Sequence, residues 1–272
     1  MPTATQEIIK KLKLGGIEPL QLTIQEARKI LGRTHVISPP GANLKLAKGE
    51  KVGWETAGLS LAPHTSAGGP TVCPHSTPQC RAFCVSGSGN AIVFQEMIDT
   101  ARVELTKLLL AHPAAFIRAM IEDVVVYGRR AAARGNKFTV RLNVFSDLEW
   151  ELIAPEIFEV MKAEGIPAFD YSKIPGRITP ENYKITLSHS EKNKWGLTPK
   201  QITDTGQNLA IPFAINRGKP FPAKWNGVRV VDGDLNDLRH LDPAGVIVGL
   251  RSKTTKDGKA DSSKGFVLKV LQ

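Results

Sequence analysis

Short apolar segments alternate with helical patterns from Lys137 onward, and this alternation limits the possible folds more than any other feature of the chain. Strands joined through helices form parallel sheets with βαβ crossovers. The predicted strands span 138–143, 167–171, 183–187, 209–215, 228–231 and 246–250, and the predicted helices between several of them span 151–164, 199–206 and 235–241. The sequence therefore predicts an α/β fold built on a parallel sheet.

The residues before this alternation divide into a helical arm and a loop-rich stretch. Helical patterns over 6–14 and 23–31 form the arm, and Thr23 precedes Glu26 at capping-box spacing. A Pro-Pro-Gly turn ends it, so we predict an N-terminal helical arm over 1–42 and an α/β domain over 43–272. That domain begins with a strand over 58–62 and long helices over 91–111 and 113–134. About seven strands in all favour a partial (β/α) barrel over a two-layer sheet.

The three cysteines of the 272-residue chain all lie in one loop after strand 58–62, as Cys73, Cys80 and Cys84. An odd number of cysteines is a poor disulfide framework, because any pairing leaves one thiol over. Several thiolates from one loop can instead converge on a metal centre. We therefore predict a metal site with these three ligands, against the alternative of three unrelated structural cysteines.

The spacing of the cysteines, with six and then three residues between them, bears on which metal they bind. A closed zinc site needs a fourth ligand, which His75 or His64 could provide, but zinc loops usually contain Cys-x2-Cys hooks and this loop has none. A [4Fe–4S] cluster held by three cysteines leaves one iron open to an external ligand. The wide spacing favours the cluster over zinc, and Pro74 and Pro78 would stiffen the loop.

Polar residues follow the predicted strands, and the functional residues of parallel α/β folds gather at the carboxyl ends of strands. Together with the cysteine loop, these residues predict one shared cleft, although no catalytic residue stands out among them. The candidates for a substrate pocket are Asp170, Tyr171, Lys173, Ser188, Ser190, Asn216, Arg217, Asp232 and Arg251.

Several polar residues also have ordinary structural explanations. Asp147 and Glu149 precede a predicted helix, whose N-terminus favours acidic side chains; alternatively, one of them binds a cationic or hydroxyl-bearing ligand. Asp232 and Asp234 fit a turn and a helix N-cap. Lys173 either binds an anionic group or is an ordinary surface lysine.

The basic charge of the chain leaves its partners open. Lysine and arginine number 36 against 26 acidic residues, giving a net charge of +10. Such a balance raises the expectation of nucleic-acid binding, yet the charge is spread out and fits an ordinary solvated surface equally well. No apolar run approaches the ~20 residues that cross a bilayer, and the N-terminus lacks a signal-peptide pattern. We therefore expect no membrane contact and a cytoplasmic location.

Several short motifs follow one another in a characteristic order. They are the three cysteines with Asn43-Leu44-Lys45-Leu46, Gly58-Leu59-Ser60-Leu61, Ala101-Arg102, Arg141-Leu142-Asn143, Ser146-Asp147, Asp170-Tyr171-Ser172-Lys173 and Leu187-Ser188-His189-Ser190. In this order they resemble a family of phage-encoded proteins named after a gene 88 product. The resemblance covers roughly residues 43 to 191 and, more weakly, the remainder, and it implies a phage origin and the host cytoplasm.

The expected architecture also resembles the radical S-adenosylmethionine enzymes, which place a three-cysteine loop after the first strand of a partial barrel. The resemblance implies a [4Fe–4S] cluster on the three cysteines and S-adenosylmethionine at its open iron. It implies cofactor-binding roles for Asn143, Ser146, Asp147 and Glu149, which stand where those enzymes carry a Gly-Gly-Glu-like segment. Here the glycine pair is absent, and the cysteine spacing is wider than the usual Cys-x3-Cys-x2-Cys.

Two functions are therefore expected from the sequence. The first is a [4Fe–4S] protein with one open iron that performs radical S-adenosylmethionine-like chemistry on an unknown substrate. The alternative is a nucleic-acid-binding protein in which an iron–sulfur or zinc site has a structural role.

Overall fold

The structure is a computed structural model that describes residues 2–43, 46–84, 95–192, 196–216, 218–252 and 264–269. The chain forms two compact units. Unit 1 comprises Met1–Pro74, Glu96–Asp170 and Ile178–Lys184, and unit 2 comprises His75–Gln95, Tyr171–Arg177 and Ile185–Gln272.

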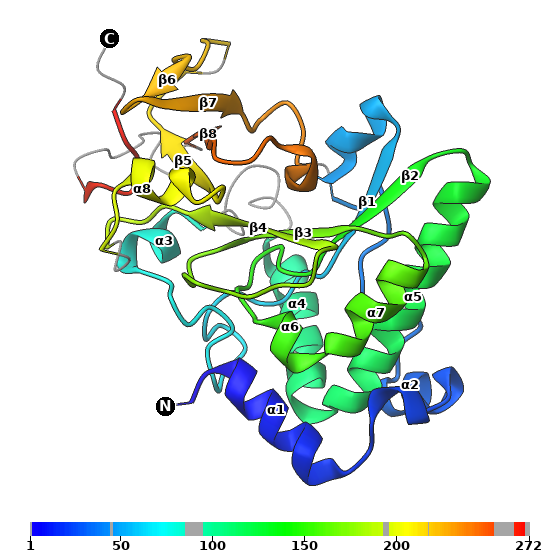
Figure 1. The fold of residues 1–272 in the computed structure, drawn as a ribbon. Helices are drawn as coiled ribbons and strands as arrows, with labels where there is room; N and C mark the ends of the chain where they lie inside the picture. Colours follow the sequence, from blue (N-terminus) through cyan, green and yellow to red (C-terminus); the bar gives the residue numbers. More distant parts are fainter. Residues whose placement is uncertain are drawn as a thin grey trace. The chain divides into compact units, whose positions relative to one another are not determined.

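The predicted α/β class is confirmed, because the strands form one mostly parallel sheet of eight strands (Figure 1). The strand order is β1-β2-β3-β4-β5-β8-β7-β6. Pairs β1–β2, β2–β3, β4–β5, β5–β8 and β7–β8 are parallel, and β6–β7 is antiparallel. The strands are β1 (Trp54–Gly58), β2 (Lys137–Arg141), β3 (Ala168–Ser172), β4 (Tyr183–Ser188), β5 (Asn208–Phe213), β6 (Lys224–Trp225), β7 (Val228–Asp232) and β8 (Ile247–Arg251).

Unit 1 is organised around the long helix α5 (Pro113–Ala133), which packs on β2 (Figure 1). Its interior face buries Phe116, Met120 and Val124 at helical spacing. Gly128 allows α5 to lie close to the side chain of Ile166, because a Cβ at position 128 would stand 2.7 Å from Ile166 Cδ1. The other helices of this unit are α1 (Ala4–Gly15), η1 (Pro19–Gln21), α2 (Ile24–Leu31), η2 (Leu46–Val52), α4 (Gln95–Ala111), α6 (Trp150–Ile153) and α7 (Pro155–Ala163).

The predicted helical arm is part of unit 1 and packs against α5 through α2. The expected capping box is present, since Thr23 Oγ1 accepts from Glu26 N and the Glu26 carboxylate accepts from Thr23 N. Asp123 of α5 fastens the segment after α2 by accepting from Val36 N at 2.7 Å and Ile37 N at 3.1 Å. This buried carboxylate thus holds the arm to the core of the unit.

Unit 2 contains α3 (Pro78–Ala82), α8 (Pro199–Asp204), the short helix η5 (Arg239–Leu241), β4 from Ile185 and the strands that follow it. Its core lies beside β5 and β8, where α8 packs on β5. The buried residues of this core include Leu209, Ile211, Phe213 and Ile247. Helix α8 starts with the capping box of Thr198 and Gln201.

Some predicted elements are wrong in position or type. The first strand is β1 at Trp54–Gly58, not 58–62, because Trp54–Gly58 aligns in register with Lys137–Arg141. The predicted helix 235–241 is only the three-residue η5, since the side chain of Asn236 accepts from Leu238 N and turns the chain before it. The predicted helix 151–164 is divided into α6 and α7 at Pro155.

Two further features complete the fold. The short strand β6 has no counterpart among the predicted elements. Within the described residues, no helix combines the length and apolar character that crossing a membrane requires.

Candidate functional site

Cys80 and Cys84 lie on and just after the one-turn helix α3 of unit 2. Thr77 caps this helix by accepting from Cys80 N at 3.2 Å, and Pro78 occupies its first turn. The turn closes where Cys84 N donates to Arg81 O at 3.3 Å. Cys84 lies two residues beyond the last residue of α3, so Cys80 and Cys84 come from one short, capped segment.

Glu191, beyond the carboxyl end of β4, fastens this turn to unit 2. Its carboxylate accepts from Thr77 Oγ1 at 2.6 Å and from Gln79 N at 3.0 Å. Burial raises the pKa of Glu191, but these hydrogen bonds outweigh burial and hold the pKa below its ordinary value of 4.5. The clamp therefore contributes stability above about pH 4.5, which is lost as the pH falls through the lowered pKa.

Replacing Glu191 with glutamine is expected to loosen α3 and expose its thiols. A neutral amide weakens the hydrogen bonds that the carboxylate accepts, so Cys80 and Cys84 should react several-fold faster with iodoacetamide in metal-free protein at pH 7. Glu181→Gln is the matched control, because Glu181 is 90% exposed and forms a long ion pair, 3.9 Å, with Lys162. Equal alkylation rates for the two variants would show that Glu191 does not hold the turn.

Lys173 and Ser188, both predicted pocket residues, are brought together by the structure. Lys173 Nζ donates to Ser188 Oγ at 2.7 Å, at the carboxyl ends of β3 and β4. Lys173 Nζ also lies 5.8 Å from the ring centroid of Phe266, and this ring stacks on Phe83 beside Cys84 with centroids 5.5 Å apart. An ammonium group, a hydroxyl and an aromatic pair thus adjoin the cysteine turn within unit 2.

His189 connects the same strand end to the segment that contains Phe266. Its Nε2 is 2.9 Å from Gly265 O, which fixes Nε2 as the donor. Burial lowers the pKa of His189, and Lys173 acts in the same direction, whereas Gly265 O and Glu191 act against them. The net lowering keeps the ring neutral near pH 7.

The buried neutral ring of His189 predicts a loss of stability in mild acid. Its folded-state pKa lies below the ordinary 6.5, so the unfolded chain binds the proton first. The stabilising contribution is therefore present above about pH 6.5 and lost as the pH falls through the lowered pKa. Urea unfolding at pH 7.5 and pH 5 should show a smaller pH effect in His189→Gln than in wild type. An identical pH effect in both would contradict this role.

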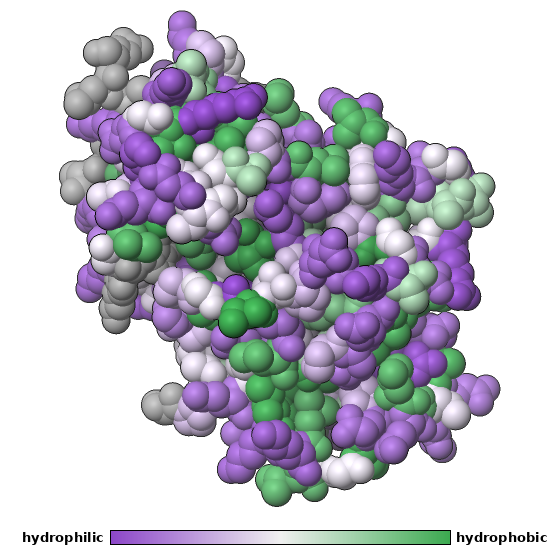
Figure 2. Space-filling model, in the orientation of Figure 1, coloured by the Kyte–Doolittle hydropathy of each residue, from purple (hydrophilic) through white to green (hydrophobic). Residues whose placement is uncertain are grey.

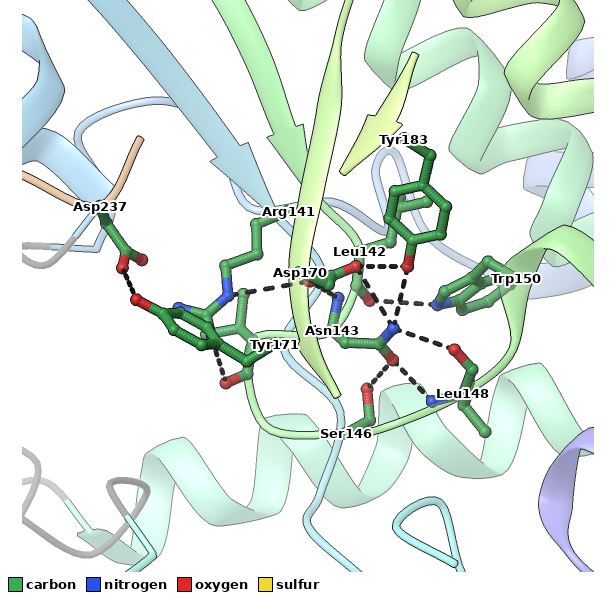
Figure 3. Close-up of polar contacts among 11 residues, drawn as sticks. Arg141, Leu142, Asn143, Ser146, Leu148, Trp150, Asp170, Tyr171, Tyr183 and Asp237 are labelled. Carbon is green, nitrogen blue, oxygen red and sulfur yellow. Dashed lines mark hydrogen bonds and ion pairs between the residues drawn. The ribbon is translucent and has the colours of Figure 1, made fainter. Parts of the chain in front are cut away.

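The loop after β2 in unit 1 is organised by Asn143 and Asp170 (Figure 3). Asp170, fully buried, accepts from Asn143 N at 2.8 Å and from Tyr183 OH at 2.8 Å, with Arg141 Nε at 3.8 Å. Asn143 Oδ1 accepts from Ser146 Oγ and from Leu148 N, and its Nδ2 donates to Leu148 O. Asn143 and Ser146 thus fix the shape of this loop from inside the unit.

Cys73 also belongs to unit 1 and is half-buried. Its sulfur accepts from His64 N at 3.3 Å and donates to Phe145 O at 3.4 Å. His64 has φ 43°, a conformation that costs energy in a non-glycine residue and often marks functional sites. Across the described parts of the chain, no three His, Cys, Asp or Glu side chains are grouped so that they could hold a metal ion.

The other predicted site residues belong to one unit or the other. Asp147 is buried, with its N–H donating to Val72 O, and Glu149 is the N-cap residue of α6. In unit 2, Tyr171 OH donates to Asp237 Oδ1 at 3.1 Å (Figure 3). Ser190 is buried, Asn216 O accepts from Lys219 N in a turn, and Arg217 lies outside the described residues.

Asp232 and Arg251, two further predicted pocket residues, pair with each other in unit 2. Arg251 Nη1 lies 3.1 Å from Asp232 Oδ2 and 3.0 Å from Asp234 Oδ2, and its guanidinium lies over the Phe221 ring. Asp234 N also donates to Asp232 Oδ1, which confirms the expected turn. Both carboxylates and the ring hold this arginine, so the pair braces the ends of β7 and β8.

The sequence alone did not indicate Glu191, Phe83 or Phe266 as site residues.

A family model covers most of the chain. The model of the Gene product 88 family matches residues 36–269. The chain belongs to the Gene product 88 family. This confirms the expected resemblance to gene 88 products, and the matched range of this Gene product 88 protein contains all three cysteines. No curated protein and no solved structure matches the chain.

Proposed function

We propose that this protein binds a [4Fe–4S] cluster through Cys73, Cys80 and Cys84. The observation that carries the proposal is the capped turn of α3, which holds Cys80 on the helix and Cys84 two residues beyond its last residue and is clamped by Glu191. Cys73 precedes Cys80 by seven residues in the sequence, and its sulfur accepts an amide N–H at 3.3 Å. Hydrogen bonds of this kind to cysteine sulfur tune iron–sulfur clusters.

The three side chains are not grouped as a ligand set in the described parts of the chain, but their donor chemistry suits iron. Each is a half-buried thiol, which keeps bulk water partly away while leaving the sulfur reachable. Soft thiolate ligands select iron–sulfur clusters or zinc over hard cations. A cluster with three cysteine ligands would supply one iron with a coordination position open to a chelating ligand such as S-adenosylmethionine.

The residues beside the cysteine turn suit an anionic or zwitterionic ligand. Lys173 supplies a positive charge held by Ser188, and the neutral His189 and the stacked Phe83–Phe266 pair limit water around it. We propose that Lys173 binds a carboxylate of the ligand and that Ser188 orients Lys173. We also propose that the fold is a partial barrel and that the protein performs radical S-adenosylmethionine-like chemistry on an unknown substrate.

Anaerobic reconstitution with iron and sulfide, followed by dithionite and S-adenosylmethionine, tests the activity. Release of 5′-deoxyadenosine by the wild type, and its loss in Lys173→Met, is the expected result. Lys184→Met is the control, because Lys184 is a half-buried lysine on β4. A bound cluster that yields no 5′-deoxyadenosine under these conditions would contradict the radical chemistry while leaving the cluster intact.

A nucleic-acid-binding role is a second candidate, favoured by exposed cations on unit 1. Within the described residues, Lys10, Lys13, Lys29 and Lys107 on α1, α2 and α4 are exposed and have no acidic partner. Figure 2 shows hydrophilic side chains interspersed with apolar ones over the visible face. Binding to duplex DNA or RNA should weaken about a thousandfold between 50 and 200 mM salt if some six phosphates are contacted. Affinity that is independent of salt would exclude this role.

A further inference from the structure

Unit 1 contains a surface pocket at the amino ends of β1 and β2. The pocket encloses about 550 Å³, within the range of small-molecule sites. Pro39 and Pro40 form an apolar wall, and Tyr127 of α5 lies behind it. Parallel α/β folds usually carry their sites at the carboxyl ends of the strands, whereas this pocket lies at the amino ends and shares no lining residue with the candidate site.

The polar base of the pocket is rigid because its charges are already paired. Arg134 donates to both carboxylate oxygens of Glu55, at 2.9 and 2.6 Å, and Asn136 Nδ2 donates to the same carboxylate at 2.8 Å. Glu55 is nearly buried, and its hydrogen bond to Arg134 lowers its pKa. The base therefore shapes the pocket and has little charge left for a ligand.

Two other charged side chains line the same pocket and are not paired within the described part of the protein. Among the described residues, neither the Arg130 side chain nor the Glu50 side chain has a hydrogen-bond or ion-pair partner, although both line the pocket. They form no ion pair with each other, and both residues are exposed at the rim of the pocket. Arg130 follows Tyr127 on α5, and Glu50 belongs to η2, so two different elements position the opposite charges.

We propose that this pocket binds a small zwitterion of the amino-acid or short-peptide class. Arg130 would hold its carboxylate, because a guanidinium matches a carboxylate in two parallel hydrogen bonds. Glu50 would hold its ammonium group, and the proline wall would contact its apolar side chains. A ligand with only one charge forms only one of these two ion pairs. The pocket should therefore prefer a zwitterion to a singly charged ligand.

Calorimetric titration of the full-length protein with the dipeptide Leu-Leu and its capped forms tests this assignment. Leu-Leu should bind at one site, and amidation of its carboxyl end or acetylation of its amino end should each weaken binding by about two- to fivefold, the effect of one exposed charge pair. In Arg130→Gln the amide cap should no longer matter, and in Glu50→Gln the acetyl cap should no longer matter. Circular dichroism checks that both variants are folded.

Arg129→Gln is the matched control, since it removes one positive charge from the adjacent position of α5. Arg129 pairs with Glu164 at 2.7 Å and is not in the pocket. It should leave the affinity for Leu-Leu unchanged. The proposal is overturned if Leu-Leu binds no better than the doubly capped dipeptide, which includes the case in which neither binds, or if Arg129→Gln and Arg130→Gln weaken binding equally.

Discussion

Serine in place of Cys73, Cys80 or Cys84 is expected to lower the iron bound after anaerobic reconstitution from about four atoms per chain to less than one. A hydroxyl is a poor ligand for iron–sulfur clusters, and a cluster with two thiolate ligands is not retained. Each serine is nearly isosteric with the cysteine it replaces, and all three thiols are only half-buried, so the fold should persist. Iron and acid-labile sulfide analysis measures the effect.

Ser76→Ala is the control for these variants. Ser76 lies in the same loop, and its hydroxyl accepts only from the exposed Arg81 at 3.3 Å. It should keep the full iron content. If one of the three serine variants also keeps it, that cysteine is not a ligand, and a different residue must complete the site.

Alanine in place of Asp170 is expected to lower the free energy of unfolding by about 3–5 kcal/mol, the usual effect of removing one partner from a buried charged network. The carboxylate is fully buried and accepts from Asn143 N and Tyr183 OH. Its removal leaves these donors, and the nearly buried Arg141, with a cavity in place of an acceptor. Urea unfolding of metal-free protein, followed by circular dichroism, measures the change.

Asp204→Ala provides the matched comparison for Asp170. Asp204 pairs with Lys200 on the surface of α8, where both side chains are more than half exposed, so its removal should cost less than about 1 kcal/mol. Asp170→Asn should fall between the two, because the amide oxygen still accepts one hydrogen bond. Similar losses for both alanine variants would show that the Asp170 network does not stabilise unit 1.

The α/β class and most strands could be predicted because their residues carry a local signal. The apolar stretches of β2, β5 and β8 are flanked by turns, and Thr23 with Glu26 marks the start of α2. Strand β1 was misplaced because Trp54–Gly58 is polar at Glu55 and Thr56, and its pairing with Lys137–Arg141 depends on residues about eighty positions away. The prediction of a helix over 235–241 was wrong because a local side-chain hydrogen bond at Asn236 competes with helix formation.

The candidate binding residues of the site could be predicted from the sequence, but the residues that hold them in place could not. The sequence singled out the cysteines, Lys173 and Ser188, and the structure joins the last two at 2.7 Å. Glu191 reaches Thr77 across 114 positions, and Phe266 stacks on Phe83 from near the chain end. Such contacts arise only from the tertiary fold, and no periodicity or spacing reports them.

The metal content of anaerobically purified protein shows whether the three cysteines bind an iron–sulfur cluster. We expect a brown sample with about four iron and four sulfide per chain and a broad absorption band near the boundary of the visible and ultraviolet. A colourless protein with one zinc per chain, or with no metal after reconstitution, would contradict this expectation.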